Sequence, residues 1–234
     1  MASDASRSAE PAVVLERQGA VYVLRMDEGE NRFNPPFVEA LHRAIDTVES
    51  HDGPCALVTT GSGKFYSNGL DLDWLGSGED TAGFLDSVHA VLGRILGLDV
   101  YTVAAVNGHA FAAGAMLAAV HDRVVMRADR GYWCLPEVDL GLPLTPEMYA
   151  ALAAHLDRRV LAEAALTGRR FSAEQAVAAG IVAEAQPEDD VLPRSIEIAS
   201  GLADKSRRVV AAHKALLYGD VVAATTAGWR KTRR

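Results

Sequence analysis

The sequence predicts a mixed α/β fold with a helical C-terminal subdomain, and three observations indicate this class. Short β-rich runs alternate with amphipathic helical stretches through the first part of the chain. The order strand, glycine turn, helix occurs twice, after Thr60 and after Val106, which is typical of stacked β/α units. From about residue 145 the pattern is almost entirely helical. We therefore predict an α/β core over residues 1–144 and a helical oligomerisation subdomain over residues 145–234.

The N-terminal elements follow from β-rich composition and from helical spacing. Residues 13–17 and 20–25 are β-rich runs joined by Gln18-Gly19, so we predict a hairpin. Pro35-Pro36 then begins a helix. Its apolar residues recur at helical spacing: Phe37, Ala40, Leu41, Ala44, Ile45 and Val48. Residues 55–59 are predicted to form a short buried strand that ends at a glycine-rich turn.

The central elements repeat this alternation. The pattern predicts an amphipathic helix over residues 84–95 and a strand over 102–106. The chain breaks at Asn107-Gly108-His109 and resumes as a helix of small residues. The remaining elements here are a helix over 112–120, a strand over 123–127 and a proline-bounded turn that carries Glu137.

The C-terminal third is predicted to consist of short helices. Two cover residues 146–156 and 158–166. Ser172 and Gln175 form a capping box for a third helix, which stops at Gly180. A brief strand at 181–182 and helices over 192–203 and 207–218 complete the chain.

Composition and charge restrict the class of protein. With 234 residues, 49% hydrophobic and 23% charged, the chain has ample material for the core of one large domain. A net charge of −8 argues against nucleic-acid binding, which needs a basic face. From Asp204 onward, however, the chain has eight Lys or Arg residues and two Asp residues, which gives a local net charge of +6. This C-terminal segment is either a solvated basic helix or a binding site for an anionic ligand such as a nucleotide phosphate.

Several features bear on location. Cys55 and Cys134 cannot form a disulfide framework and are expected to be buried thiols, consistent with a cytoplasmic protein. The N-terminal MASDASRSAE lacks the apolar core of a signal peptide. Residues 103–120 are apolar, but the break at 107–109 and Gly114 interrupt them, so we predict no membrane segment. The C-terminal KTRR is not an SKL-type peroxisomal signal.

Two backbone turns and one acidic residue are the candidates for a catalytic site. The G-x-S-x-G, Walker A and H-E-x-x-H motifs are absent, and no cysteine or histidine has metal-ligand spacing. The turns SNGLD (67–71) and AFAAGAM (110–116) lie at equivalent points of two β/α units, so their N–H groups could converge on an oxyanion. Glu137 could be a base facing them. His109 is either functional or a turn residue bonded to backbone. His121-Asp122 looks like a helix end, where an imidazole suits the helix dipole.

Four segments resemble one family. KFYSNGLDL is similar to F-x-A-G-x-D-[IL], and AAVNGHAFAAGAML is similar to A-x-x-G-x-A-x-G-G-G-x-x-L. LPEVDLGLP resembles P-E-x-x-x-G, and TGRRFSAEQAVAAGIVAEA resembles T-G-x-x-x-x-A-x-E-A-x-x-x-G-[IL]-V. These are the motifs of the crotonase (enoyl-CoA hydratase/isomerase) superfamily, in order and at family spacing. The variants look most like the Δ3,Δ2-enoyl-CoA isomerases of the plant-like type.

The resemblance implies a crotonase/ClpP-like spiral of ββα units and a set of site residues. The oxyanion-hole N–H groups fall on Leu70 and Ala113, and a catalytic glutamate falls on Glu137. The family's other catalytic glutamate is replaced by Met116, whose thioether cannot activate water. The remaining substrate-binding positions implied by the family are Ser67, Asn68, Gly69, Asp71 and Gly114, the first four along the CoA pantetheine and adenine.

One base suits a double-bond shift, so the expected reaction converts 3-enoyl-CoA to 2-trans-enoyl-CoA without a cofactor or metal, CoA being part of the substrate. The alternatives are a hydratase or another crotonase reaction using Asp139 or Glu147, and a silent acyl-CoA binder. Apolar neighbours should raise the pKa of Glu137: Trp133, Leu135, Pro136, Val138 and Leu140. The resemblance also implies a homotrimer or dimer of trimers, and the basic Lys205, Arg207 and Arg208 are expected to approach the CoA phosphates.

Overall fold

The computed structural model describes residues 12–77 and 80–232. The interpretation of MASDASRSAE and the charges of Arg233 and Arg234 lie outside these residues. In the part described, no helix is long and apolar enough to cross a membrane.

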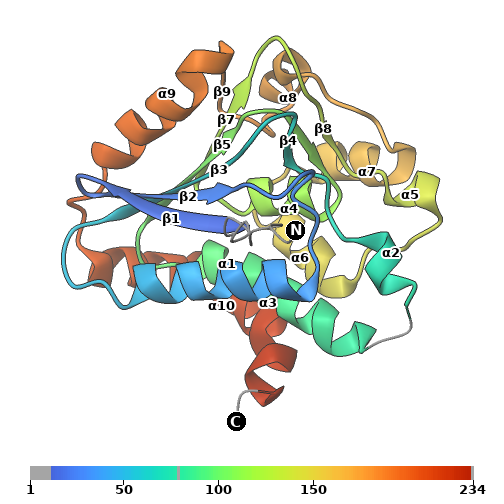
Figure 1. Cartoon of the computed structure of the whole chain (residues 1–234), viewed down its shortest axis with the longest axis horizontal. Helices are drawn as coiled ribbons and strands as arrows, with labels where there is room; N and C mark the ends of the chain where they lie inside the picture. Colours follow the sequence, from blue (N-terminus) through green and yellow to red (C-terminus); the bar gives the residue numbers. More distant parts are fainter. Residues whose placement is uncertain (1–11, 78–79, 233–234) are drawn as a thin grey trace, which may run out of the picture.

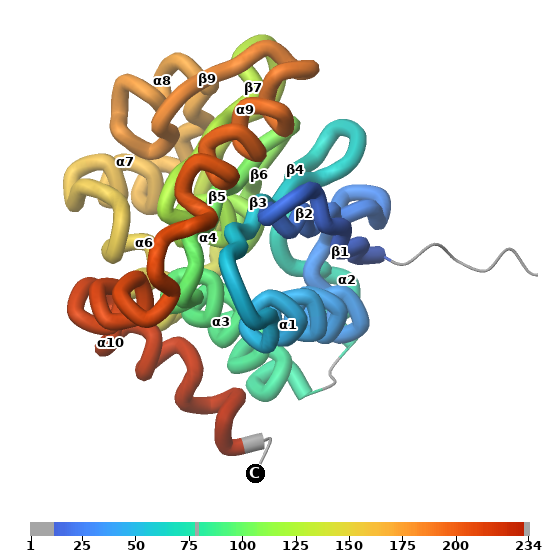
Figure 2. The backbone as a smooth tube through the Cα atoms, turned by 90° about the vertical axis from the view of Figure 1, so that its left-hand side faces the viewer, coloured from blue at the N-terminus to red at the C-terminus, as the bar shows by residue number. Residues whose placement is uncertain are grey.

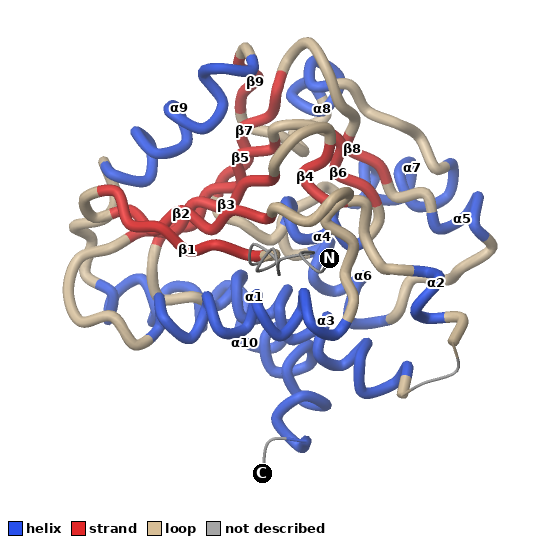
Figure 3. The backbone as a smooth tube through the Cα atoms, in the orientation of Figure 1, coloured by secondary structure: helices blue, strands red, loops and turns tan. Residues whose placement is uncertain are grey.

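A six-stranded sheet forms the centre of the molecule (Figure 3). Its order is β1-β2-β3-β5-β7-β9, and every neighbouring pair is parallel except the antiparallel hairpin β1–β2, which confirms the predicted hairpin. The strands are β1 (Val13–Gln18), β2 (Val21–Met26), β3 (Ala56–Gly61), β5 (Tyr101–Val106), β7 (Arg123–Arg127) and β9 (Glu184–Gln186). Parallel neighbours need crossover connections, and helices supply them.

A second, three-stranded parallel sheet was not predicted. It consists of β4 (Phe65–Ser67), β6 (His109–Phe111) and β8 (Trp133–Cys134), each too short for a periodic signal. The turns that lead into these strands stack closely: a β-carbon on Gly108 would lie 2.1 Å from the Lys64 oxygen, and one on Gly131 would lie 2.6 Å from the Gly108 oxygen. The β3–β4, β5–β6 and β7–β8 pairs are each followed by a helix. The predicted spiral of ββα units is therefore confirmed.

Helices cover both faces of the large sheet (Figures 1 and 2). Helix α9 (Glu188–Ser200) packs on one face and forms a smaller core with inward residues of β2, β3, β5 and β7. On the other side lie α1 (Pro35–Glu49), α3 (Thr81–Gly97) and α10 (Arg207–Thr232), and the main core extends between them and the sheet. The shorter helices are α2 (Leu72–Leu75), α4 (Ala113–Ala119), α5 (Glu137–Leu140), α6 (Pro146–Ala153), α7 (Arg158–Thr167) and α8 (Ala173–Ala178).

Three predictions for the C-terminal third need correction. The strand expected at 181–182 is wrong; β9 begins two residues after it, where the backbone pairs with β7. Helix α9 begins at Glu188 rather than at 192, because acidic residues of its first turn suit the helix N-terminus. Helix α10 continues to Thr232, well past Tyr218. The capping box of Ser172 and Gln175 is confirmed. The division at residue 144 stays a prediction.

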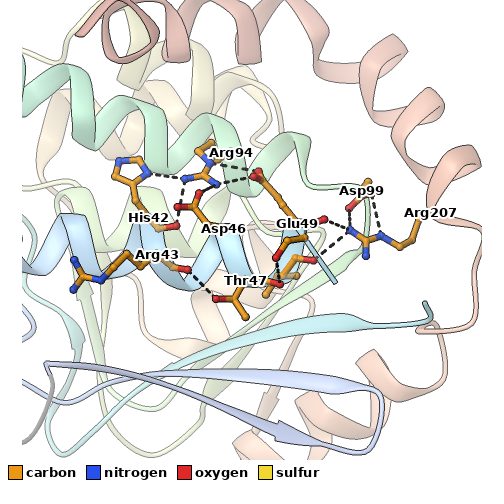
Figure 4. A network of polar contacts seen from close by, with 10 residues as sticks. His42, Arg43, Asp46, Thr47, Glu49, Arg94, Asp99 and Arg207 are labelled. Atoms are coloured by element: carbon orange, nitrogen blue, oxygen red, sulfur yellow. Dashed lines mark hydrogen bonds and ion pairs between the residues drawn. The ribbon is translucent and has the colours of Figure 1, made fainter. Parts of the chain in front are cut away.

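Helix α10 is held to α3 by close packing and to the end of α1 by the half-buried Arg207, and Arg94 of α3 pairs with α1. A β-carbon on Gly93 would lie 2.0 Å from the Thr225 hydroxyl oxygen, so the two helices approach closely here. Arg207 donates to both carboxylate oxygens of Asp99, at 2.7 and 3.0 Å, and to carbonyl groups at the end of α1 (Figure 4). Arg94 donates at 2.6 Å to Asp46 and at 2.7 Å to Glu49.

Candidate active site

A cavity of about 820 Å³ opens beside the two glycine-containing turns. Its wall comes from the 68–73 and 111–113 segments, from α5 and the residues after it, and from the first turns of α3 and α6. The wall is mainly apolar: Leu70, Leu72, Leu75, Leu85, Phe111, Ala112, Ala113, Pro136, Leu140, Leu142, Pro143 and Met148. Its polar members are Arg32, Asn68, Asp73, Thr81, Glu137 and Thr145. A volume of this size suits a small-molecule ligand with a hydrocarbon portion.

Two backbone N–H groups meet in this wall. Ala113 is the first residue of α4, so its N–H has no partner within the helix, and no side chain caps that helix. The N–H of Leu70 likewise has no hydrogen-bond acceptor in residues 12–77 and 80–232. A β-carbon on Gly69 would lie 3.1 Å from the Ala113 nitrogen and 2.7 Å from the Ala112 methyl group, so the two turns touch and position 69 admits only glycine. Two such donors can hold an oxyanion.

The turn before α4 is strained. Ala112 has φ of 50° and ψ of −126°, a conformation that glycine adopts easily and a residue with a β-carbon does not. Its carbonyl accepts from the Met116 N–H at 3.0 Å and so begins the α4 ladder. The strained residue, Ala112, is therefore the one that orients the Ala113 N–H toward the cavity.

Glu137 supplies a buried carboxyl to the same cavity. It begins the four-residue helix α5 after Pro136, where the sequence predicted a turn, and its side chain is only 9% exposed. Its Oε2 atom has no hydrogen-bond partner among the described residues. Burial raises the pKa of this carboxyl above its usual 4.5, as the apolar neighbours led us to expect. A carboxylate that is buried, unpaired and open to a cavity is suited to removing a proton from a ligand.

The first turn is built by polar contacts around these atoms. Asn68 lines the cavity and donates to Glu30 at 2.8 Å. The Ser67 hydroxyl is buried; it accepts from the Gly69 N–H at 3.1 Å and donates to the Asn31 carbonyl at 2.7 Å. Asp71 caps α2 by accepting from the Trp74 N–H at 3.2 Å. Ser67, Gly69 and Asp71 therefore shape the turn from outside the cavity wall.

Two further predicted positions lie behind the wall. A β-carbon on Gly114 would lie 2.4 Å from the Ser67 carbonyl oxygen, so this glycine lets α4 pack against β4. Met116 is fully buried in the main core and is not part of the cavity wall. The alternative acids Asp139 and Glu147 also lie outside the wall. Arg32 and Asp73, paired at 3.7 Å, do belong to it, and no sequence pattern singled them out.

The histidines of the central stretch have different surroundings. His121 lies just past the C-terminal end of α4, as predicted, but it is 1% exposed, and burial lowers its pKa to about 3. Its Nδ1 donates to the Leu117 carbonyl at 2.7 Å, and its Nε2 accepts from the Thr59 hydroxyl at 2.9 Å. His109 lies on the small sheet, away from the cavity wall. Cys55 and Cys134 are buried free thiols, as predicted.

Comparisons with known proteins agree with this geometry. A family model described as enoyl-CoA hydratase/isomerase matches residues 16–231. Enoyl-CoA delta isomerase 3 of Arabidopsis thaliana is 37% identical over 82% of this chain and 84% of its own length. Enoyl-CoA delta isomerase 2, peroxisomal, of the same plant is 35% identical over 88% and 92%. An apo structure of an enoyl-CoA isomerase from Mycobacterium tuberculosis, 29% identical, superposes with a TM-score of 0.85 over 93% of this chain and 96% of that one.

Proposed function

The chain belongs to the enoyl-CoA hydratase/isomerase family, and we propose that it shifts the double bond of a 3-enoyl-CoA to give the 2-trans-enoyl-CoA. The observation that carries this proposal is Glu137, the single buried carboxyl that the described residues supply to the cavity wall, with one oxygen unpaired. The relatives named enoyl-CoA delta isomerase support the same reaction.

The reaction needs one base and one oxyanion site. Glu137, ionised, removes a proton from C2 of the bound thioester, and the electron pair moves to the thioester oxygen to form a dienolate. The N–H groups of Leu70 and Ala113 donate hydrogen bonds to that oxygen. The protonated Glu137 then returns the proton to C4, and the double bond re-forms between C2 and C3. No atom is gained or lost, so the step needs no cofactor.

The carboxylates in and near the cavity favour isomerisation over hydration. Hydration in this family requires a second carboxylate to position water, and its place is taken by the buried thioether of Met116. The wall's other carboxylate among the described residues, Asp73, has a side chain 96% exposed and is paired with Arg32. It is therefore too well solvated to share a water molecule with Glu137 in an apolar pocket.

Turnover of the two isomeric substrates tests the proposal. The purified chain should convert 3-enoyl-CoA to 2-trans-enoyl-CoA and should form no 3-hydroxyacyl-CoA from 2-trans-enoyl-CoA. Products are measured by chromatography and mass spectrometry. Hydration that persists in Glu137→Gln would contradict the assignment and favour the hydratase alternative. Tight acyl-CoA binding without turnover of either substrate would favour the silent binder.

Assembly and location are part of the same proposal. We propose a homotrimer or dimer of trimers, supported by three leucines on the helical third that stand in solvent: Leu166 at 74%, Leu216 at 86% and Leu217 at 68%. Sedimentation at a monomer mass would contradict it. A cytoplasmic location is proposed although two relatives are named peroxisomal; a fluorescent fusion with an organelle marker tests this. Activity that survives dialysis against a chelator would support the absence of a metal cofactor.

A further inference from the structure

Leu70, one of the two candidate oxyanion donors, lies opposite Phe33 in an isolated parallel bridge. The Phe33 N–H donates to the Gly69 carbonyl at 2.7 Å, and the Phe33 carbonyl accepts from the Asp71 N–H at 2.9 Å. In such a bridge the residue between the two bonded positions turns its own N–H to the opposite side. The pairing therefore directs the Leu70 N–H away from Phe33 and leaves it free for a ligand in the cavity, whose wall includes Leu70 but not Phe33.

Asn31 fixes the segment that makes this pairing. It is fully buried and has φ of 52°, a left-handed conformation that asparagine adopts more readily than most residues with a β-carbon. Its backbone N–H donates to the Glu28 carbonyl at 2.7 Å, and its side-chain oxygen accepts from the Glu28 N–H at 2.9 Å. Asn31 thus closes the turn 28–31 and sets the direction in which the chain continues to Phe33.

Asn31 also bonds to the end of β4. Its amide nitrogen donates to the Phe65 carbonyl at 3.3 Å and to the Tyr66 carbonyl at 3.1 Å. Its backbone carbonyl accepts from the Ser67 hydroxyl at 2.7 Å, and this hydroxyl accepts in turn from the Gly69 N–H at 3.1 Å. A continuous chain of hydrogen bonds therefore runs from Asn31 to the residue directly before the oxyanion donor.

The neighbouring N–H groups of the turn are all occupied. The Asn68 N–H donates to the Glu30 carbonyl at 2.9 Å, and the N–H groups of the residues on either side of Leu70 are bonded as described above. Within 68–71, Leu70 alone has an N–H without an acceptor among the described residues. Asn31 does not belong to the cavity wall, so it acts on a ligand there only through the turn.

We propose that Asn31 is a positioning residue of the oxyanion site, which holds the Leu70 N–H in the direction of the thioester oxygen. The use of that N–H in catalysis rests on the proposed function. A preorganised donor stabilises the transition state without reorganising, and a displacement of about 1 Å can cost about 10²-fold in rate. The buried amide supplies both donors and an acceptor to this arrangement, whereas glycine shares the backbone conformation but lacks the amide.

Two asparagines next to β4 allow a matched comparison. Asn31→Gly is the test variant, because it keeps the left-handed backbone and removes the amide. Asn107→Ala is the control: the Asn107 amide accepts from the Gly61 N–H at 2.9 Å and donates to the Gly63 carbonyl at 3.1 Å, at the turn before β4. Both variants remove an amide that braces this strand, so both should lower the melting temperature. Only Asn31 also bonds to the turn that begins at Ser67.

The polarisation of a bound thioester measures the oxyanion site directly. A saturated acyl-CoA, isotopically labelled at the thioester carbon, has no double bond to shift, and its C=O stretching band moves to lower frequency when the oxygen accepts hydrogen bonds. We expect this shift in the wild type and in Asn107→Ala, and its partial loss in Asn31→Gly. With a 3-enoyl-CoA, the kcat of Asn31→Gly should fall about tenfold or more while KM stays near the wild-type value, because the donor acts in the transition state.

A full band shift with wild-type kcat in Asn31→Gly would overturn the proposal, as would equal losses in Asn107→Ala. A wild type without a shifted band would overturn it as well, since no donor would then polarise the thioester. A wild type that shows the band but does not isomerise 3-enoyl-CoA would contradict the proposed function alone, and the bands of the variants would still decide on Asn31. Should Asn31→Gly not fold, Ser67→Ala interrupts the same hydrogen-bond chain, and the same criteria apply to it.

Discussion

Glu137 and Lys214 are both buried ionisable residues, but their surroundings differ. Lys214, 6% exposed on α10, donates to Asp122 at 2.7 Å and to the Val100 carbonyl at 3.1 Å. Asp122 also accepts from the Thr102 N–H and hydroxyl, at 2.8 and 3.0 Å. Glu137, 9% exposed, leaves Oε2 with no partner among the described residues.

The difference separates a group used for folding from a group kept for a ligand. Burial outweighs the neighbouring carboxylate and lowers the pKa of Lys214, so even a paired charge is costly to bury. No neighbouring cation compensates the burial of the Glu137 carboxylate, so packing elsewhere in the core must offset the free energy that its burial costs. We infer that removing the Lys214 charge should damage stability, and removing the Glu137 charge should damage activity alone.

The largest expected effect is the loss of turnover in Glu137→Gln. The amide cannot accept the C2 proton, so kcat should fall by about 10²–10⁴. Because the variant removes an unpaired buried charge, its melting temperature should equal or exceed that of the wild type. Steady-state kinetics and calorimetry measure the two. Asp139→Asn, on the exposed side of the same helix, is the control and should change neither. A destabilised Glu137→Gln would show that the carboxyl has a structural partner.

Lys214→Met should have the opposite signature. It leaves Asp122, whose side chain is 13% exposed, charged and without its cation, which costs up to about 3–5 kcal/mol of unfolding free energy in buried pairs. The kcat of the folded fraction should stay near the wild-type value, because Lys214 is outside the cavity wall. Urea unfolding provides the measurement. Adding Asp122→Asn should recover part of the loss; a double variant no more stable than the single one would mean that Thr102 and Val100, not the ion pair, dominate the site.

This contrast also shows what the sequence could reveal. Local patterns led to the turns 67–71 and 110–116 and to Glu137, because a turn after a strand and an acid after a proline are local features; the resemblance to the family then placed the two donors on Leu70 and Ala113. The unpaired state of the Glu137 oxygen depends on which atoms of distant segments do not reach it, and no local pattern carries that information. The small sheet has the same limitation. Its three strands have two or three residues each, too short to be predicted, and they meet only through strand pairing.

A smaller effect should appear as a function of pH. The pKa of Glu137 is raised in the folded chain, so this carboxyl adds no cost below its unfolded value of 4.5 and costs stability as the pH rises through the folded pKa. The melting temperature of Glu137→Gln relative to the wild type should therefore increase from about pH 4 toward neutrality and then level off. In the wild type, kcat/KM should fall on acidification through the same pKa, since the base must be ionised. If the difference in melting temperature between Glu137→Gln and the wild type does not change with pH, the Glu137 carboxyl is exposed to solvent in solution.

The smallest effect is expected at Ala112 in the strained turn before α4. A substitution there tests whether the backbone strain contributes to the oxyanion site. Ala112→Gly relieves a positive-φ conformation that costs about 1–3 kcal/mol, less the entropy that glycine loses on folding, about 0.4–1 kcal/mol. We expect a melting temperature higher by a few degrees and an unchanged kcat, because the Ala113 N–H is retained. Ala115→Gly in the buried helix α4 is the matched control and should lower stability by about 1 kcal/mol or more, because it adds a helical glycine and removes a buried methyl group. A kcat lowered in Ala112→Gly but not in the control would mean that the rigid alanine is needed to orient the Ala113 N–H. The site would then cost stability through its backbone conformation as well as through the buried Glu137.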